Sequence, residues 1–162
     1  MSLVGRSLIG RRVFIALEDD MEKTLLEQSI LIRDLDHVRL REWLDHRAVP
    51  DEQDSDYVDA LRRKLCDAVV VSPERISREV VTMNSLVGLR DMQLDEKLTC
   101  FLAYPDEADL LQRKVSVAVP LGTEMLGRPV GAIVAVPVNN GVRQLRIERV
   151  YYQPQAAGDF HL

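Results

Sequence analysis

The sequence predicts an α+β protein, in which a short N-terminal antiparallel helical hairpin is followed by an antiparallel β-sheet domain with one short helix. Three observations predict this class. Apolar residues recur at helical spacing between residues 34 and 68, β-branched runs separated by turn signals begin beyond residue 79, and a proline-to-glycine segment in the second half has room for one short helix.

Length and composition limit the possible organisation and partners. The chain has 162 residues, 46% hydrophobic and 29% charged, which is enough to bury one sizeable core. Its 21 basic and 26 acidic side chains are interspersed and give a net charge of −5, so we expect no strong direct nucleic-acid binding. Residues 13–17 form a short apolar run that cannot span a bilayer, and we expect a cytoplasmic monomer with no membrane contact.

We expect three segments along the chain. Residues 1–29 form an N-terminal extension of unknown role, residues 30–72 a helical hairpin, and residues 73–162 the sheet domain. The two cysteines, Cys66 and Cys100, lie in apolar surroundings without metal-ligand spacing, which predicts buried thiols in a reducing compartment.

The first helix of the hairpin is predicted from Asp34, a residue type that caps helices, to about Arg47. Leu40, Trp43 and Leu44 form its apolar face. Val49-Pro50 then ends the helix, because proline disfavours helical geometry in the residue before it.

The second helix is predicted to begin at Ser55, which can cap it. Its apolar seam is Tyr57, Leu61, Leu65 and Ala68, recurring at steps of four, four and three residues. Two such helices joined by a short loop should pack antiparallel. The tip between them carries an acidic cluster of Asp51, Glu52, Asp54 and Asp56.

Six strands are predicted for the sheet domain, over residues 80–83, 86–90, 98–104, 115–119, 132–138 and 142–152. Asn140-Gly141 indicates a tight type I′ hairpin turn between the last two strands. The short helix is predicted over residues 121–126, with Pro120 at its start and Gly127 just past its end.

The sheet domain resembles the C-terminal domain of the bacterial Gre transcript-cleavage factors, which implies an FKBP-like fold. Three pieces carry the resemblance. The first is the acidic turn Tyr104-Pro105-Asp106-Glu107-Ala108-Asp109. The second is a buried strand followed by a helix that starts at a proline, Lys114 to Gly122, and the third is a helix that ends in Leu-Gly, within Met125 to Gly131. Two further pieces, residues 80–85 and 153–160, are similar to one branch of that family, the regulators of nucleoside diphosphate kinase.

The resemblance implies a non-catalytic transcription regulator that binds RNA polymerase near its secondary channel and competes with Gre cleavage factors. Glu107 and Asp109 would pair with basic groups of the polymerase, and the edge formed by Val119, Pro120 and Leu121 would supply an apolar contact. The residues that follow this edge are as readily explained by turn geometry and core packing as by binding: Gly122, Leu126, Gly127 and Gly131.

Two alternatives stay open. In Gre factors a long arm carries acidic tip residues that help to hold a catalytic magnesium ion, so the tip acids of this chain could stimulate transcript cleavage. The chain could instead be an interaction module for another cytoplasmic protein.

An enzyme is not expected. The sequence has no nucleophile elbow and no glycine-rich phosphate loop, and His37, His46 and His161 are far apart in sequence. We expect no catalytic residue, no resident metal, no cofactor and no small-molecule substrate.

Overall fold

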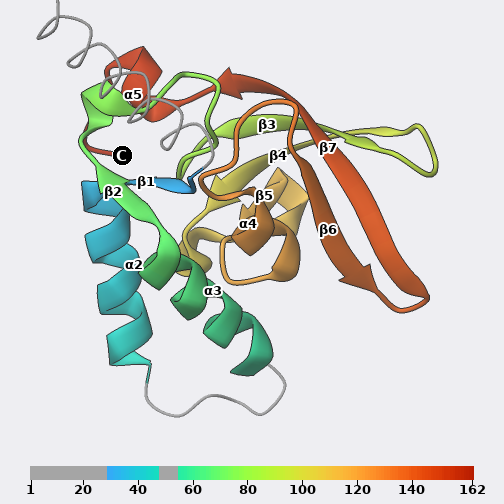
Figure 1. The fold of residues 1–162 in the computed structure, drawn as a ribbon, viewed down its shortest axis with the longest axis horizontal. Coiled ribbons are helices and arrows are strands. Elements are labelled where there is room, and N and C mark those ends of the chain that lie inside the picture. Colours follow the sequence, from blue (N-terminus) through green and yellow to red (C-terminus); the bar gives the residue numbers. More distant parts are fainter. Residues whose placement is uncertain (1–28, 48–54) are drawn as a thin grey trace, which may run out of the picture.

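The computed structural model describes residues 29–47 and 55–162, and its main elements are two helices and a five-stranded sheet. The helices are α2 (Asp34–His46) and α3 (Ser55–Asp67). The sheet has the order β5-β4-β3-β7-β6 and contains β3 (Leu86–Asp91), β4 (Lys97–Ala103), β5 (Lys114–Ser116), β6 (Ile133–Val138) and β7 (Gly141–Tyr152). Figure 1 shows α2 and α3 side by side below the sheet. The predicted α+β class is therefore confirmed.

The two helices form the predicted antiparallel pair. Leu40 and Leu44 of α2 are buried, as are Leu61 and Leu65 of α3. The predicted seam is wrong at its first position, because Tyr57 is 41% exposed and the neighbouring Val58 is buried instead. Val58, Leu61 and Leu65 are spaced by three and four residues, so the buried stripe is rotated by one residue at the start of the helix.

A two-stranded parallel sheet at the base of the hairpin was not expected. β1 (Leu31–Arg33) pairs with β2 (Val69–Val71), with Leu31 opposite Val69 and Arg33 opposite Val71. Val69–Val71, where no strand was predicted, is thus a strand. This pairing closes the hairpin where it joins the sheet domain (Figure 1).

The strand predicted over residues 80–83 is wrong. Val80 makes only an isolated bridge with Pro129, and the N–H of Val81 donates to the carbonyl oxygen of Arg128 at 2.9 Å. All four residues are buried, and an apolar buried segment of this length resembles a strand in the sequence. The following residue, Asn84, has a φ of +62°, and this left-handed conformation turns the chain before β3. Within the part of the chain that the structure describes, the main sheet therefore has five strands.

Strand pairing in this sheet is antiparallel with one exception. β3 pairs antiparallel with β4 and β7, and β6 pairs antiparallel with β7, but the short β5 runs parallel to β4. A segment of irregular chain between β4 and β5 makes this crossover possible. It contains the short 3₁₀ helices η2 (Pro105–Glu107) and η3 (Leu110–Gln112). The expectation of a wholly antiparallel sheet is wrong at this edge.

The β6–β7 hairpin is confirmed, but its turn is not the predicted one. Val138 pairs with Gly141, so the two loop residues are Asn139 and Asn140. Neither asparagine has a positive φ, and Gly141 alone has one, +135°. A type I′ turn needs positive φ at both central residues, so that turn type is excluded.

The short helix α4 (Pro120–Met125) begins at proline and is followed by Gly127, which has a φ of +75°, as predicted. Gly122 is the tightest position of this helix. A Cβ atom there would lie 2.0 Å from the backbone carbonyl oxygen of Ser116, so only glycine allows α4 to pack so closely against the chain after β5.

One hydrophobic core joins the helices to the sheet. Leu40 and Leu61 lie in the same buried cluster as Val87 and Ile147 of the sheet. The division into hairpin and sheet domain remains a prediction, and the extension over residues 1–29 lies almost entirely outside the described residues. Among the described helices, none is both long and apolar enough to cross a bilayer.

The two cysteines differ in environment. Cys100 is buried, as predicted, and burial raises the pKa of its thiol to about 11. Cys66 is exposed, contrary to the prediction, because it lies on the solvent side of α3 next to the buried Leu65. Neither cysteine forms a disulfide.

Candidate partner-binding surface

The two carboxylates predicted to bind a partner, those of Glu107 and Asp109, differ in their contacts. Glu107 ends η2 and is exposed, and within the described residues its side chain accepts no hydrogen bond. Asp109 is half-buried and caps η3, because its Oδ1 accepts the N–H of Leu111 at 2.9 Å. Its backbone also pairs with Lys114 in both directions, at 3.0 and 2.8 Å. Glu107 is therefore free to meet a partner, whereas Asp109 also holds the turn together.

Two leucines that the sequence analysis did not single out are the most exposed apolar side chains of this region. Leu110 is 82% exposed and Leu111 is 97% exposed, directly after the capping Asp109. Adjacent large apolar residues that face water are typical of interaction sites. The signal available in the sequence was a pair of leucines between an acidic turn and the basic pair Arg113-Lys114, too short a segment to bury both.

The predicted apolar edge is only partly exposed. Val119 is 40% exposed, while Pro120 and Leu121 are half-buried and Leu121 packs against the core. This apolar edge and the acidic turn both lie at the β5 edge of the sheet, because β5 contacts η2, η3 and α4. The structure thus brings the predicted residues to one sheet edge.

An aromatic groove lies between α2 and the acidic turn. Its main part has a volume of about 620 Å³, and an adjoining part along α2 has about 540 Å³. Aromatic rings make up much of its lining, with charges of both signs beside them: Trp43, Phe101, Tyr104, Tyr152, Arg39, Asp106 and Glu107. Tryptophan, tyrosine and arginine are the residues that contribute most at protein interfaces. This lining therefore suits a protein segment.

Arginine side chains lie over two of these rings. The guanidinium of Arg39 is 5.9 Å from the ring centroid of Tyr104, and that of Arg47 is 5.0 Å from the ring centroid of Trp43. Contacts of this kind hold the rings in place and leave positive charge at the rim of the groove.

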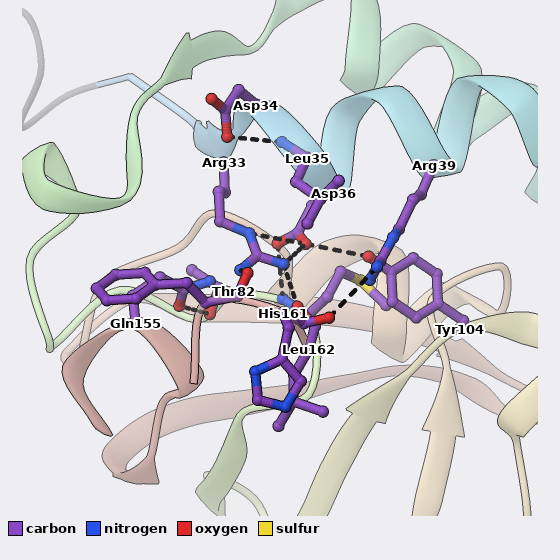
Figure 2. A network of polar contacts seen from close by, with 12 residues as sticks. Arg33, Asp34, Leu35, Asp36, Arg39, Thr82, Tyr104, Gln155, His161 and Leu162 are labelled. Atoms are coloured by element: carbon purple, nitrogen blue, oxygen red, sulfur yellow. Dashed lines mark hydrogen bonds and ion pairs between the residues drawn. The ribbon is translucent and has the colours of Figure 1, made fainter. Parts of the chain in front are cut away.

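A buried ion pair contacts Tyr104 of the groove lining, and Figure 2 shows the polar contacts of this pair. Arg33 and Asp36 are both fully buried, and the Nε and Nη2 atoms of Arg33 donate to Oδ1 of Asp36 at 3.1 and 2.6 Å. The hydroxyl of Tyr104 donates to the same oxygen at 3.0 Å. Burial and the carboxylate of Asp36 together raise the pKa of Tyr104, so the phenol stays protonated as a donor.

The same network holds the last residues of the chain. Arg33 also donates to the carbonyl oxygens of Phe160 and Leu162, and Arg39 donates to that of His161 at 3.3 Å. His161 and Leu162 in turn line the groove. Arg33 and Asp36 together therefore connect the start of α2, the residue after β4 and the C-terminal residues around this surface (Figure 2).

The structure describes only one of the four acidic residues predicted at the hairpin tip. Asp56 lies in the first turn of α3 and is exposed, where its charge favours the helix start. Asp51, Glu52 and Asp54 lie outside the described residues. Within residues 29–47 and 55–162, no three histidine, cysteine, aspartate or glutamate side chains gather as a metal site would require.

Comparison with known proteins identifies the family. Residues 76–152 match the family described as "Transcription elongation factor, GreA/GreB, C-term". The chain is 35% identical over 135 residues to the regulator of nucleoside diphosphate kinase of Escherichia coli, covering 83% of this chain and 97% of that protein. It is 29% identical over 138 residues to transcription elongation factor GreA of Chloroherpeton thalassium, covering 81% and 87% of the two chains.

A solved structure agrees with these matches. The prokaryotic transcription elongation factor GreA/GreB from Nitrosomonas europaea superposes with a TM-score of 0.64 and 35% identity, over 76% of this chain and 98% of that one. The similarity thus extends beyond the sheet domain into the helical region. The chain belongs to the Gre family of transcription elongation factors.

Proposed function

We propose that this chain is a non-catalytic transcription regulator that binds RNA polymerase near the secondary channel and competes there with Gre cleavage factors. Family membership supports the general role in transcription. The finer proposal, occupancy without cleavage, rests on the length of the hairpin.

Hairpin length is the observation that carries the proposal. α2 and α3 have 13 residues each, so each is about 20 Å long at about 1.5 Å per residue. Part of that length lies against the sheet, since Leu40 and Leu61 belong to the shared core. The resemblance to Gre cleavage factors implies that their arms are far longer. A hairpin of this length, held at the channel mouth, would leave its tip acids short of the polymerase metal site.

The binding surface would be the sheet edge described above. Leu110 and Leu111 offer an exposed apolar contact, and Glu107 offers a carboxylate that has no ion pair within the described residues. Trp43 and Tyr104 line the adjoining groove. Such a surface complements a polymerase element with apolar residues flanked by basic ones. A partner of that kind would bury the leucines that the monomer exposes.

Binding and competition can be measured with purified core RNA polymerase. The wild-type chain should bind and be displaced by a Gre factor. Leu110→Ser/Leu111→Ser should weaken binding at least about tenfold, since central apolar contacts contribute more than 1 kcal/mol each. The matched control is Val138→Ser/Val142→Ser, which changes two exposed valines at the far β6–β7 turn and should bind like wild type.

Charge reversal tests the acidic contact. Glu107→Lys should weaken binding without a change in melting temperature. Asp109→Lys should also weaken binding, but it removes the cap of η3 and should alter the local fold as well. Wild-type binding by both the leucine and the Glu107 variants would remove this surface from the proposal.

A backtracked elongation complex tests the absence of cleavage. The chain should not shorten the transcript, and it should inhibit shortening by a Gre factor as its concentration rises. Transcript shortening that disappears in an Asp51→Ala/Asp54→Ala variant would instead establish the cleavage-stimulating alternative. Failure to retain polymerase, with a different protein captured from the native cytoplasm, would favour the interaction-module alternative.

A further inference from the structure

Three basic residues lie in one row across the outer face of the sheet. Lys97 of β4 is directly opposite Arg90 of β3, which is directly opposite Arg146 of β7. Directly paired residues of antiparallel strands point to the same face, and the flanking pair Leu89 and Ile147 is buried on the other face. Like charges at paired positions destabilise a sheet, so this arrangement costs folding free energy.

Only the central cation of the row is neutralised within the described residues. Arg90 donates to Glu148 through Nε and to Asp95 through Nη1, the latter at 2.5 Å. Neither Lys97 nor Arg146 has an ion pair in this part of the chain. A surplus of positive charge therefore gathers on one face of a chain whose net charge is −5.

An aromatic ring lies on the sheet beside this row. A Cβ atom at Gly88 would lie 2.7 Å from Cε2 of Tyr151, so the absence of a side chain at Gly88 gives the ring its place on the sheet surface. Tyr151 remains 58% exposed. The guanidinium of Arg149, which is opposite Gly88 on β7, lies 5.8 Å from the ring centroid.

These side chains line one shallow groove of about 440 Å³, which includes Lys97, Arg146, Arg149 and Tyr151. Among the described residues that line it, Glu148 is the one acid, and it is paired with Arg90. Cations near an exposed ring are the combination that proteins use for single strands, where the cations contact phosphates and the rings stack on bases.

We propose that this outer face binds single-stranded nucleic acid. Lys97, Arg146 and Arg149 contact successive phosphates, and Tyr151 stacks on an unpaired base. Charge complementarity selects a polyanion, and the exposed ring selects a strand whose bases are free. This binding is independent of the proposed polymerase contact, which uses the β5 edge. It departs from the expectation of no strong nucleic-acid binding, because that expectation rests on the net charge and averages over the surface.

Fluorescence anisotropy with labelled oligonucleotides of about 12 residues tests the proposal, a length within the site sizes of single-strand binders. The probes are oligouridylate, the DNA strand of the same length, and an RNA duplex. Lys97→Ser/Arg146→Ser should weaken oligouridylate binding and lower the slope of log K against log salt by about 1.4, at about 0.7 per lost phosphate contact. Tyr151→Leu should weaken binding about 5- to 150-fold.

The matched control is Arg62→Ser/Arg63→Ser, which removes the same charge from exposed positions on α3 and should leave affinity and salt slope nearly unchanged. If the RNA and DNA strands bind with equal affinity, the face contacts phosphates and bases but not the 2′-hydroxyl. If the RNA strand binds more tightly, RNA is the ligand. No binding to either strand at low salt would overturn the proposal. Equal loss in the α3 control, or equal affinity for the duplex, would overturn it too.

Discussion

Raising the pH from 7 to 9 should stabilise this protein through one buried lysine. Lys64 of α3 is 8% exposed, and its Nζ atom donates to the carbonyl oxygens of Thr123 and Glu124 in α4, at 2.5 and 2.9 Å. Burial lowers the pKa of this amine from 10.5 to about 7, and the nearby Arg128 adds to the shift, while Glu124 opposes it. Lys64 therefore connects the hairpin to the sheet domain at a titratable contact.

The sign of the effect follows from proton binding. Between pH 7 and 10.5 the unfolded chain holds a proton on Lys64 that the folded chain has largely lost, so stability rises with pH in that window. The contribution is fully present above pH 10.5 and is lost as the pH falls to 7. With a limiting slope of about 1.4 kcal/mol per pH unit, the rise between pH 7 and 9 is about 2 kcal/mol.

Urea unfolding at pH 7, 8 and 9 measures this contribution as the difference in the free energy of unfolding between wild type and Lys64→Met. Other titrating groups affect both proteins alike, so the free energy of unfolding of wild type should gain about 2 kcal/mol over that of the variant across the range. Arg62→Met, on the exposed side of the same helix, should keep the wild-type dependence. Parallel pH dependences of wild type and Lys64→Met would refute the reasoning.

Three further substitutions test the packing that positions the surface. Gly122→Ala should cost about 3 kcal/mol or more, because the new Cβ would lie 2.0 Å from the carbonyl oxygen of Ser116 and the obstacle is backbone. Leu61→Ala should cost about 2–5 kcal/mol, as it empties part of the core shared by hairpin and sheet. Arg33→Met should cost about 3–5 kcal/mol, because it leaves Asp36 charged, buried and without its cation. Urea midpoints measure all three.

Each of these substitutions has a control. Gly88→Ala should cost less than Gly122→Ala, since the atom it meets belongs to the exposed ring of Tyr151, which can move. Tyr57→Ala should change stability by no more than about 0.5 kcal/mol, because its side chain faces solvent. Arg33→Met/Asp36→Leu should recover most of the loss of the single variant. A double variant as unstable as Arg33→Met would show that the ion pair is not the cause.

Much of the candidate surface was predictable and part of it was not. The acidic turn with Glu107 and the proline-started helix α4 were identified from the sequence, because turn residues and helix ends carry local signals. Leu110 and Leu111 were missed, since apolar residues are expected inside unless the chain around them is known to be irregular. The groove could not be predicted, because its walls come from α2 and from the end of β4, which are distant in sequence.

The sequence by itself determined the two helices, four of the six predicted strands nearly as they stand, and the position of the short helix. These elements follow from periodicity and turn chemistry, which are local. Tertiary structure alone decided the parallel pairing of β1 with β2, the burial of Lys64, and the row of Lys97, Arg90 and Arg146. The physical reason is that periodicity shows which residues of one strand share a face, whereas strand order and register decide which residues of other strands lie beside them.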